Sequence, residues 1–180
     1  MLTIVFALII AAIAAVLLVA AFRPAHFRIQ RTVTIAAAPD TVFAELQDFR
    51  RWRNWSPWED VDPELRRTFS GAQSGEGAVY DWDSDNPKAG KGRMTILEAR
   101  APNKLVIELA FIKPFAATNT AEFTMQSCDD GAILTWAMHG PSPFVSRLFG
   151  LVFNMDKLIG SDFEKGLARL KSLTETRAAA

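Results

Sequence analysis

The sequence predicts an α+β protein with an antiparallel sheet of about seven strands, a long C-terminal helix against it and an N-terminal transmembrane helix before it. Three observations predict this architecture: the chain opens on an uninterrupted apolar run, its middle alternates apolar and polar residues in short segments, and its end returns to helical spacing. A sheet with one apolar face needs a cover, and the terminal helix is the element long enough to provide it.

Length and charge limit the function classes. A chain of 180 residues is one domain, or one domain with an appendage. Its 20 basic and 20 acidic residues cancel, so the chain lacks the basic surface that a nucleic-acid partner requires. Cys128 is the only cysteine, which excludes an intramolecular disulfide and a thiolate metal site built from this chain alone.

The apolar run from Leu2 to Phe22 would span about 31 Å as a helix, the thickness of a bilayer's hydrocarbon core. A cleaved signal peptide is the alternative, since Val19 and Ala21 suit a small-residue cleavage site before Phe22. No basic region precedes the run, and the run exceeds the usual apolar length of a signal of about 7–15 residues. We therefore expect residues 1–26 to form a single-pass membrane anchor and a short link.

The basic residues near this run indicate its orientation. Arg23, His26, Arg28 and Arg31 all follow it, so the positive-inside rule places the rest of the chain in the cytoplasm. Arg28 and Arg31 also fall in a predicted strand, which weakens this inference. Export by a cleaved signal peptide remains the alternative localisation.

The first strand and the first helix follow directly. Residues 26–37 alternate, with Phe27, Ile29, Val33 and Ile35 on one side, as in a strand. Residues 38–49 change to helical spacing, with Pro39 and Asp40 suited to the first turn. We expect one strand and one short amphipathic helix here.

Six further strands are predicted between Leu65 and Gly140, separated by turn clusters at 71–77, 83–90, 101–103 and 128–131. They lie around residues 65–69, 79–82, 93–98, 105–112, 118–126 and 133–139. The spacing leaves no room for crossover helices and predicts antiparallel meander connections. Alternation assigns to the inner face Tyr80, Trp82, Met94, Ile96, Leu105, Ile107, Leu109, Phe111, Phe123, Met125, Leu134, Trp136 and Met138.

After residues 140–143 the helical period returns and persists, with an apolar stripe that includes Met155, Phe163 and Leu170. If the run breaks near Gly160, Ser161 or Asp162 could start the final segment. We expect residues 177–180 to form a disordered tail.

This order of elements resembles the polyketide cyclase/dehydrase-like family of the SRPBCC (START/Bet v 1-like) superfamily. The resemblance rests on "APDTVFAELQDFRRWRNWSPWE" (38–59), "LTWAMHG" (134–140) and "NMDKLIGSDFEKGLARLKSL" (154–173). It implies a helix-grip fold over residues 27–176, in which a curved sheet wraps the last helix and leaves a ligand-binding cavity. It also implies a short second helix near the cavity mouth, carrying three tryptophans three residues apart.

Two interpretations of these tryptophans stay open: core packing, or a lining for the ligand entrance. Base stacking is disfavoured because the arginines among them are balanced by acidic residues. For a ligand cavity we expect the following lining: Trp52, Trp55, Trp58, Tyr80, Trp82, Met94, Ile107, Leu109, Phe111, Asn119, Phe123, Trp136, Phe163 and Leu167.

No catalytic or metal motif is apparent. His26 and His139 are far apart in sequence, and His139 is expected to point outward. Asp81, Asp83 and Asp85 fit solvated carboxylates better than a calcium loop. Gly166, in the middle of a helix, indicates either close approach of the sheet or room for a ligand.

We therefore expect a membrane-tethered protein that binds a hydrophobic or lipid-like small molecule, with no cofactor, no metal and no nucleic-acid partner. Two alternatives stay open. One is a ligand-free structural or interaction module, since 5 tryptophans and 13 phenylalanines suffice to fill its core. The resemblance also allows a cyclase or dehydratase that acts by confining its substrate.

Overall fold

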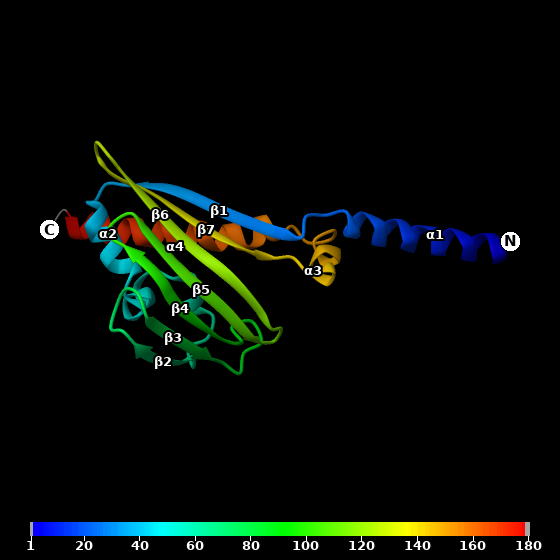
Figure 1. Cartoon of the computed structure of the whole chain (residues 1–180), viewed down its shortest axis with the longest axis horizontal. Coiled ribbons are helices and arrows are strands. Elements are labelled where there is room, and N and C mark those ends of the chain that lie inside the picture. The colour runs from blue at the N-terminus through cyan, green and yellow to red at the C-terminus, as the bar shows by residue number, and fades with distance from the viewer. Residues whose placement is uncertain (1, 179–180) are drawn as a thin grey trace.

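The computed structural model describes residues 2–178, and residues 1, 179 and 180 lie outside this description. One antiparallel sheet holds seven strands in the order β1-β7-β6-β5-β4-β3-β2, and α4 packs against its concave face (Figure 1). The elements are α1 (Leu2–Ala21), β1 (His26–Ile35), α2 (Pro39–Leu46), the 3-10 helices η1 (Phe49–Asn54) and η2 (Pro57–Asp60), β2 (Arg66–Gly71), β3 (Ala78–Asp83), β4 (Lys91–Arg100), β5 (Lys104–Lys113), β6 (Ala117–Cys128), β7 (Gly131–Pro141), α3 (Phe144–Phe149) and α4 (Met155–Ala178).

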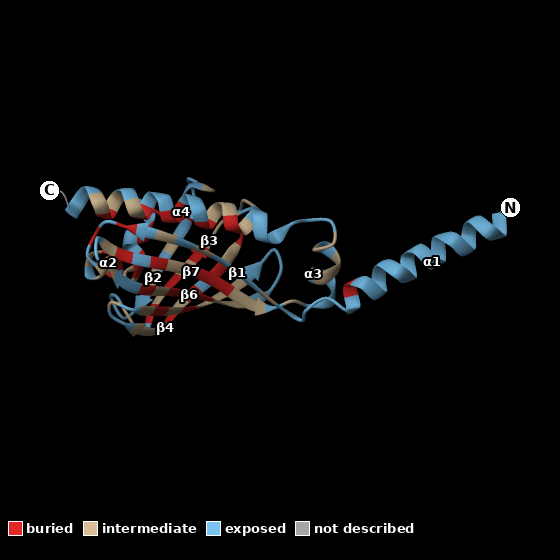
Figure 2. Cartoon of the chain, turned by 90° about the horizontal axis from the view of Figure 1, so that it is seen from above, coloured by how far each residue is buried: buried red, intermediate tan, exposed pale blue. Residues whose placement is uncertain are grey.

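The sheet confirms the period-two prediction. All six expected segments are strands joined as a meander, and β1 closes the sheet by pairing with β7, with His26 opposite Pro141 and Ile35 opposite Ala132. Every residue assigned to the inner face is buried or half-buried, and the buried positions lie between the sheet and α4 (Figure 2). Alternation predicts the inner face correctly because one face of this sheet packs on the hydrophobic core while the other faces solvent.

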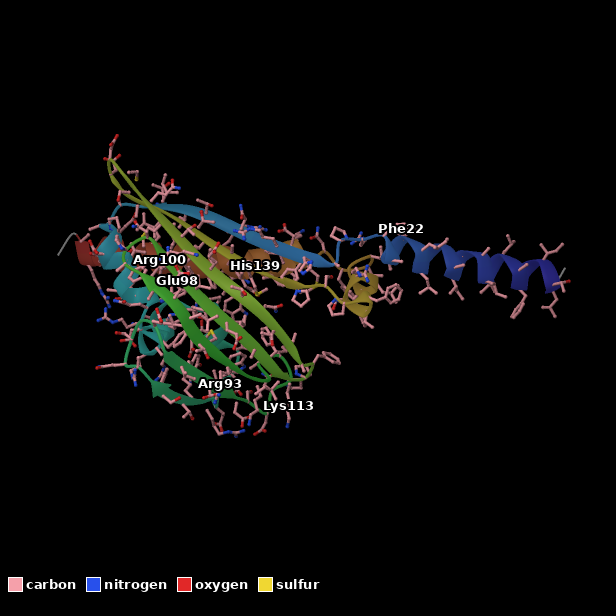
Figure 3. The ribbon with its side chains drawn as sticks, viewed as in Figure 1. Phe22, Arg93, Glu98, Arg100, Lys113 and His139 are labelled. Carbon is pink, nitrogen blue, oxygen red and sulfur yellow. The ribbon has the colours of Figure 1, made fainter. Side chains whose placement is uncertain are left out.

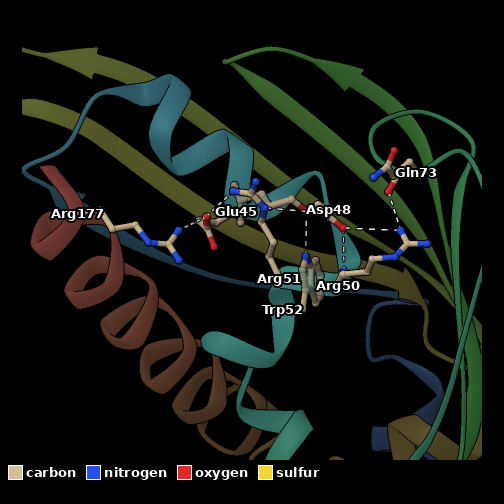
Figure 4. A network of polar contacts seen from close by, with 8 residues as sticks. Glu45, Asp48, Arg50, Arg51, Trp52, Gln73 and Arg177 are labelled. Carbon is tan, nitrogen blue, oxygen red and sulfur yellow. Dashed lines mark hydrogen bonds and ion pairs between the residues drawn. The ribbon is translucent and has the colours of Figure 1, made fainter.

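A buried carboxylate links α2, η1 and the end of α4. Glu45 on α2 is 1% exposed, and its Oε1 accepts hydrogen bonds from Arg51 of η1 at 2.8 Å and from Arg177 of α4 (Figure 4). Trp52 Nε1 donates to the Leu46 carbonyl at 2.9 Å. These contacts hold α2, η1 and the end of α4 together.

The C-terminal helical region differs from the prediction in two places. The helix does not break near Gly160, the condition under which Ser161 or Asp162 would start a segment; the break falls at residues 150–154, between α3 and α4. Asn154 Oδ1 accepts from the Lys157 amide at 3.0 Å, as a helix N-cap does. The helix continues through Gly160, and a glycine suits this position because a side chain there would collide with the Arg31 guanidinium, which crosses the helix to Asp156 and Glu164.

The two ends of the chain complete the fold. α1 is long and apolar enough to cross a membrane, and Ala20 is its buried residue. It projects away from the domain beside α3 (Figure 1). At the other end α4 includes Arg177 and Ala178, so two residues of the expected disordered tail are helical; the other two, 179 and 180, lie outside the described residues.

Candidate functional site: a cavity between the sheet and the C-terminal helix

A cavity of about 220 Å³ lies between the inner face of the sheet, η2 and α4. Nine of the residues expected from the sequence line it: Trp52, Trp58, Tyr80, Trp82, Met94, Leu109, Phe111, Trp136 and Phe163. The remaining lining residues were not anticipated: Ser56, Glu59, Val61, Leu65, Lys88, Ala89, Ala121, Met138 and Ile159. The walls are mainly apolar, as small-molecule sites usually are.

Five expected residues lie elsewhere. Trp55, Ile107, Phe123 and Leu167 are packed in the hydrophobic core, each no more than 2% exposed. Asn119 lines a separate groove nearer to α1. Their positions follow from the curvature of the sheet. One part of its inner face packs against α4, and another part is held away from α4.

An aromatic stack forms the wall on the α4 side. The Trp136 ring lies between Phe123 and Phe163, with ring centroids at 4.9 and 4.3 Å. A Cβ on Gly166 would come within 2.9 Å of Trp136 Cζ3, so this glycine permits the close approach of sheet and helix. The Trp136 indole nitrogen is buried and has no hydrogen-bond partner among residues 2–178.

The tryptophan cluster divides between core and site. Trp55 is fully buried in the core, while Trp52 is both buried and part of the cavity wall. Trp58 is 39% exposed and meets Trp136 and Phe163 edge-to-face at 5.4 and 6.0 Å. Trp55 therefore packs in the core, and Trp58 lies at the edge of the cavity.

A loop contact positions η2 at this edge. Asp62, just after η2, accepts a short hydrogen bond from the Ser84 hydroxyl, and Asn86 Nδ2 donates to the Val61 carbonyl at 3.2 Å. The Ser84 hydrogen bond, and after it the Glu64 amide, lower the pKa of the Asp62 carboxyl. The loop after β3 thus holds Trp58 and Glu59 in place.

A hydrogen-bonded polar pair, Tyr80 and Glu59, lies in the wall of the apolar cavity. Tyr80 Oη donates to Glu59 Oε1 at 2.8 Å, and Arg67 Nε donates to Glu59 Oε2 at 2.6 Å. The side chains of Glu59 and Arg67 are only 7% and 15% exposed. Burial, and after it the Glu59 carboxylate, raise the pKa of the Tyr80 phenol well above its usual range. The phenol therefore stays a hydrogen-bond donor, and the ion pair satisfies the buried charges.

Glu59 and Arg67 are not in the cavity lining predicted from the sequence, where Glu59 counts only among the acidic residues that balance the arginines. The available signal was the alternation of Leu65, Arg67 and Phe69, which puts an arginine on the inner face opposite Trp82. A buried arginine requires a carboxylate partner. Glu59, next to the tryptophan cluster, was the candidate.

A larger groove of about 970 Å³ adjoins the cavity on the side of α1. It runs between the start of β1, the hairpin that joins β5 to β6, α3 and the start of α4. Phe111, Met138 and Ile159 line both the cavity and the groove. These three side chains form the partition between the two spaces.

Other clusters of titratable residues lie outside the cavity. Asp81 and Asp83 pair with Arg93 and Lys91 at 2.7 and 3.0 Å on the outer face. His139 lies opposite Arg28 across β7 and β1 (Figure 3). Within the described residues, no group of three His, Cys, Asp or Glu side chains is placed to hold a metal ion.

Comparison with known proteins places the fold. A family model described as "Polyketide cyclase / dehydrase and lipid transport" matches residues 26–175. The solved structure of SA2116, a protein of unknown function from Staphylococcus aureus, superposes with a TM-score of 0.64 at 10% identity, covering 86% of this chain and 97% of that one. Protein CV1439 from Chromobacterium violaceum superposes with a TM-score of 0.57 at 15% identity, covering 84% and 99%.

The di-domain ARO/CYC protein StfQ of the steffimycin biosynthetic pathway superposes with a TM-score of 0.62 at 14% identity. The match covers 86% of this chain and 52% of StfQ, so the chain spans about half of that protein. No curated protein matches the sequence significantly. At these identities the solved structures establish the helix-grip fold and carry no substrate across.

Proposed function

The chain belongs to the polyketide cyclase / dehydrase and lipid transport family, and from that premise we propose that it is a membrane-tethered protein that binds a hydrophobic or lipid-like small molecule. The observation that carries this proposal is the apolar cavity of about 220 Å³ between the sheet and α4, next to a groove of about 970 Å³. A core filled by its own aromatic side chains, as a ligand-free module would have, does not leave such a space.

The lining specifies the chemistry of the ligand. Aromatic and aliphatic walls favour an apolar body, and the Tyr80–Glu59 pair offers one hydrogen-bonding position. An amphipathic molecule with one hydrogen-bonding group on an apolar body matches this lining. The cavity is smaller than the roughly 300–1,000 Å³ of whole ligand sites, so it suits one ring or a short acyl segment.

The tether follows from α1. Its 20 residues span about 30 Å as a helix, enough for the hydrocarbon core of a bilayer. The link from Phe22 to His26 is short, so the groove would lie close to the membrane where apolar ligands partition. The basic residues after α1 favour a cytoplasmic position for the domain.

Catalysis by confinement is a second candidate, favoured by the polar pair in the cavity wall. Tyr80 remains protonated and donates its single hydroxyl hydrogen to Glu59, so its oxygen is left to accept a hydrogen bond from a hydroxyl group of a folded polyketide-like substrate. No nucleophile or metal is required for such a role. The chemical identity of the bound molecule separates this candidate from simple lipid binding.

The test is native mass spectrometry of the full chain purified gently from its own membranes, followed by solvent extraction of whatever co-purifies. Leu109→Trp fills the cavity, and Leu97→Trp is its matched control at an exposed position on β4. We expect a stoichiometric small molecule on the wild type and on Leu97→Trp, and severalfold less on Leu109→Trp. A wild type without bound molecule, or equal occupancy in both variants, contradicts the binding function.

A further inference from the structure

We propose that the end of the domain beside α1 docks on the bilayer surface, so that the groove opens onto lipid. This docking face comprises α3, the turn after it and the tip of the β5–β6 hairpin. The inference rests on the membrane tether proposed above and adds a second, peripheral contact to it. Three independent features of this face carry it.

The first feature is exposed apolar surface. Side chains that soluble proteins usually bury are open to solvent here: Phe22 (86%), Phe115 (82%), Val145 (60%), Phe149 (59%), Val152 (80%) and Phe153 (57%). They surround the groove and the end of α1, and Figure 3 shows Phe22 at the junction and Lys113 near the hairpin tip. Exposed apolar side chains gathered at one end of a domain in this way are typical of an interaction site.

The second feature is the position of α3 relative to the membrane surface. Arg147 of α3 donates Nη1 to the Ala21 carbonyl at 2.9 Å and to the Arg23 carbonyl at 3.2 Å. Arg23 in turn donates Nη1 to the Gly150 carbonyl at 2.8 Å. Because α1 is as long as the hydrocarbon core is thick, Ala21 lies at its boundary, and these bonds hold α3 at the same level.

The third feature is charge. Neither Arg23 nor Arg147 forms an ion pair with a carboxylate within residues 2–178; both guanidinium groups contact backbone carbonyls. Positive charge interleaved with phenylalanine and valine is the pattern of an interfacial segment, which attracts anionic headgroups while its apolar side chains enter the acyl boundary. A bilayer is therefore the occupant that fits this face, since α1 already ends there.

Site-specific fluorescence in vesicles tests the docking. The full chain carries Cys128→Ser and one new cysteine labelled with an environment-sensitive dye, in vesicles of phosphatidylcholine and phosphatidylglycerol with a fraction of lipid spin-labelled near the headgroup. Val145→Cys and Val152→Cys probe the docking face. Leu97→Cys is an exposed apolar control outside it, and Asp129→Cys probes the far end of β6, about 36 Å from Ala117.

We expect lipid quenching at positions 145 and 152 to exceed that at 97 and 129 severalfold. Equal quenching at all four positions overturns the docking. A further label at Leu17→Cys reports the tether separately: quenching there without quenching at 145 and 152 leaves the tether standing and removes the docking. Self-quenching of the Val152→Cys label that rises with the protein-to-lipid ratio, without lipid quenching, assigns the face to a second copy and also overturns the proposal.

Discussion

Tyr80 is the residue at which the chemistry of the cavity is most clearly defined. It lies on β3 with its ring stacked on Phe69 at 5.1 Å and its hydroxyl bonded to Glu59. The arrangement costs the desolvation of a carboxylate, which Arg67 offsets by its hydrogen bond to the other oxygen. A polar triad built this way places a phenol oxygen in the cavity wall, with its hydrogen donated to Glu59, and leaves no unpaired charge.

We predict that Tyr80 resists ionisation. Burial and then Glu59 raise the pKa of its phenol above the ordinary value of about 10. A group whose folded pKa is raised contributes stability that is fully present below the unfolded pKa and is lost as pH rises through the folded value. The free energy of unfolding should therefore start to fall above about pH 10.

Tyr80 is the only tyrosine in the chain, so the rise in phenolate absorbance on alkaline titration reports this residue alone. The folded protein should show no phenolate near pH 10, and the same protein in denaturant should titrate with an ordinary midpoint of about 10. Tyr80→Phe serves as the control with no phenolate signal. Coincident titrations of the folded and unfolded protein would contradict the buried Tyr80–Glu59 pair.

Several of the lining aromatic residues could be predicted from the sequence, and the alternation of β2 also puts Arg67 on the inner face, but the direction of the Glu59 side chain could not be predicted. Tyr80, Trp82 and Trp136 follow from strand alternation, because a side chain on the inner face of this sheet must meet α4 or a cavity. Glu59 comes from an irregular 3-10 segment, where no period assigns a face. Irregular segments take their direction from tertiary contacts, here the loop after β3.

At the scale of elements, α4 both packs against the sheet and contributes side chains to the cavity wall. Gly166 lets Trp136, which stacks on Phe163 of the same helix, approach its backbone, and Gly160 lets Arg31 cross it. Close approach of the sheet is one of the two explanations that the sequence allows for Gly166, and the structure has it. A break near Gly160 was left open because the residue that occupies its space, Arg31, is on β1, far away in sequence.

We predict that Ile159 on α4 controls passage between the groove and the cavity. Ile159→Ala shortens one of the three side chains of the partition and should speed the release of a bound fluorescent fatty acid such as cis-parinaric acid. The expected acceleration is about tenfold, which corresponds to about 1.4 kcal/mol of barrier. Stopped-flow displacement by an excess of unlabelled fatty acid measures this rate.

Leu158→Ala is the matched control, because Leu158 is the neighbouring aliphatic residue of α4 and is 62% exposed. Its release rate should equal that of the wild type. Equal rates for the Ile159 and Leu158 variants, with the fatty acid bound in both, would mean that the ligand does not pass this partition. The free energy of unfolding, measured in parallel, separates a local effect from general loosening.

At the scale of the whole molecule, the order of the elements could be predicted from the sequence, but the tertiary contacts between them could not. Period-two and helical segments gave a seven-stranded sheet with a terminal helix, and the structure confirms both. α3 and the groove depend on contacts between residues more than 100 positions apart, such as Arg147 with Ala21. No pattern within a single segment carries that information.

These long-range contacts bear on whether α1 is retained in the mature protein. Ala20 is fully buried, and the Ala21 and Arg23 carbonyls accept hydrogen bonds from Arg147. Cleavage before Phe22, as in a signal peptide, would remove part of this junction and release α3 from it. The apolar run is also longer than the usual run of about 7–15 residues in a signal. The junction favours an anchor that stays.

We therefore predict that protein isolated from its native membranes has an intact mass that includes α1 and remains in the membrane pellet after an alkaline carbonate wash. Arg147→Ala should keep the same mass and pellet, because α1 alone supplies the anchoring, but should raise amide exchange in α3 because the bonds to Ala21 and Arg23 are lost. A mature chain that begins near Phe22 and is recovered in the soluble fraction would assign α1 to a signal peptide, and the domain to an exported protein.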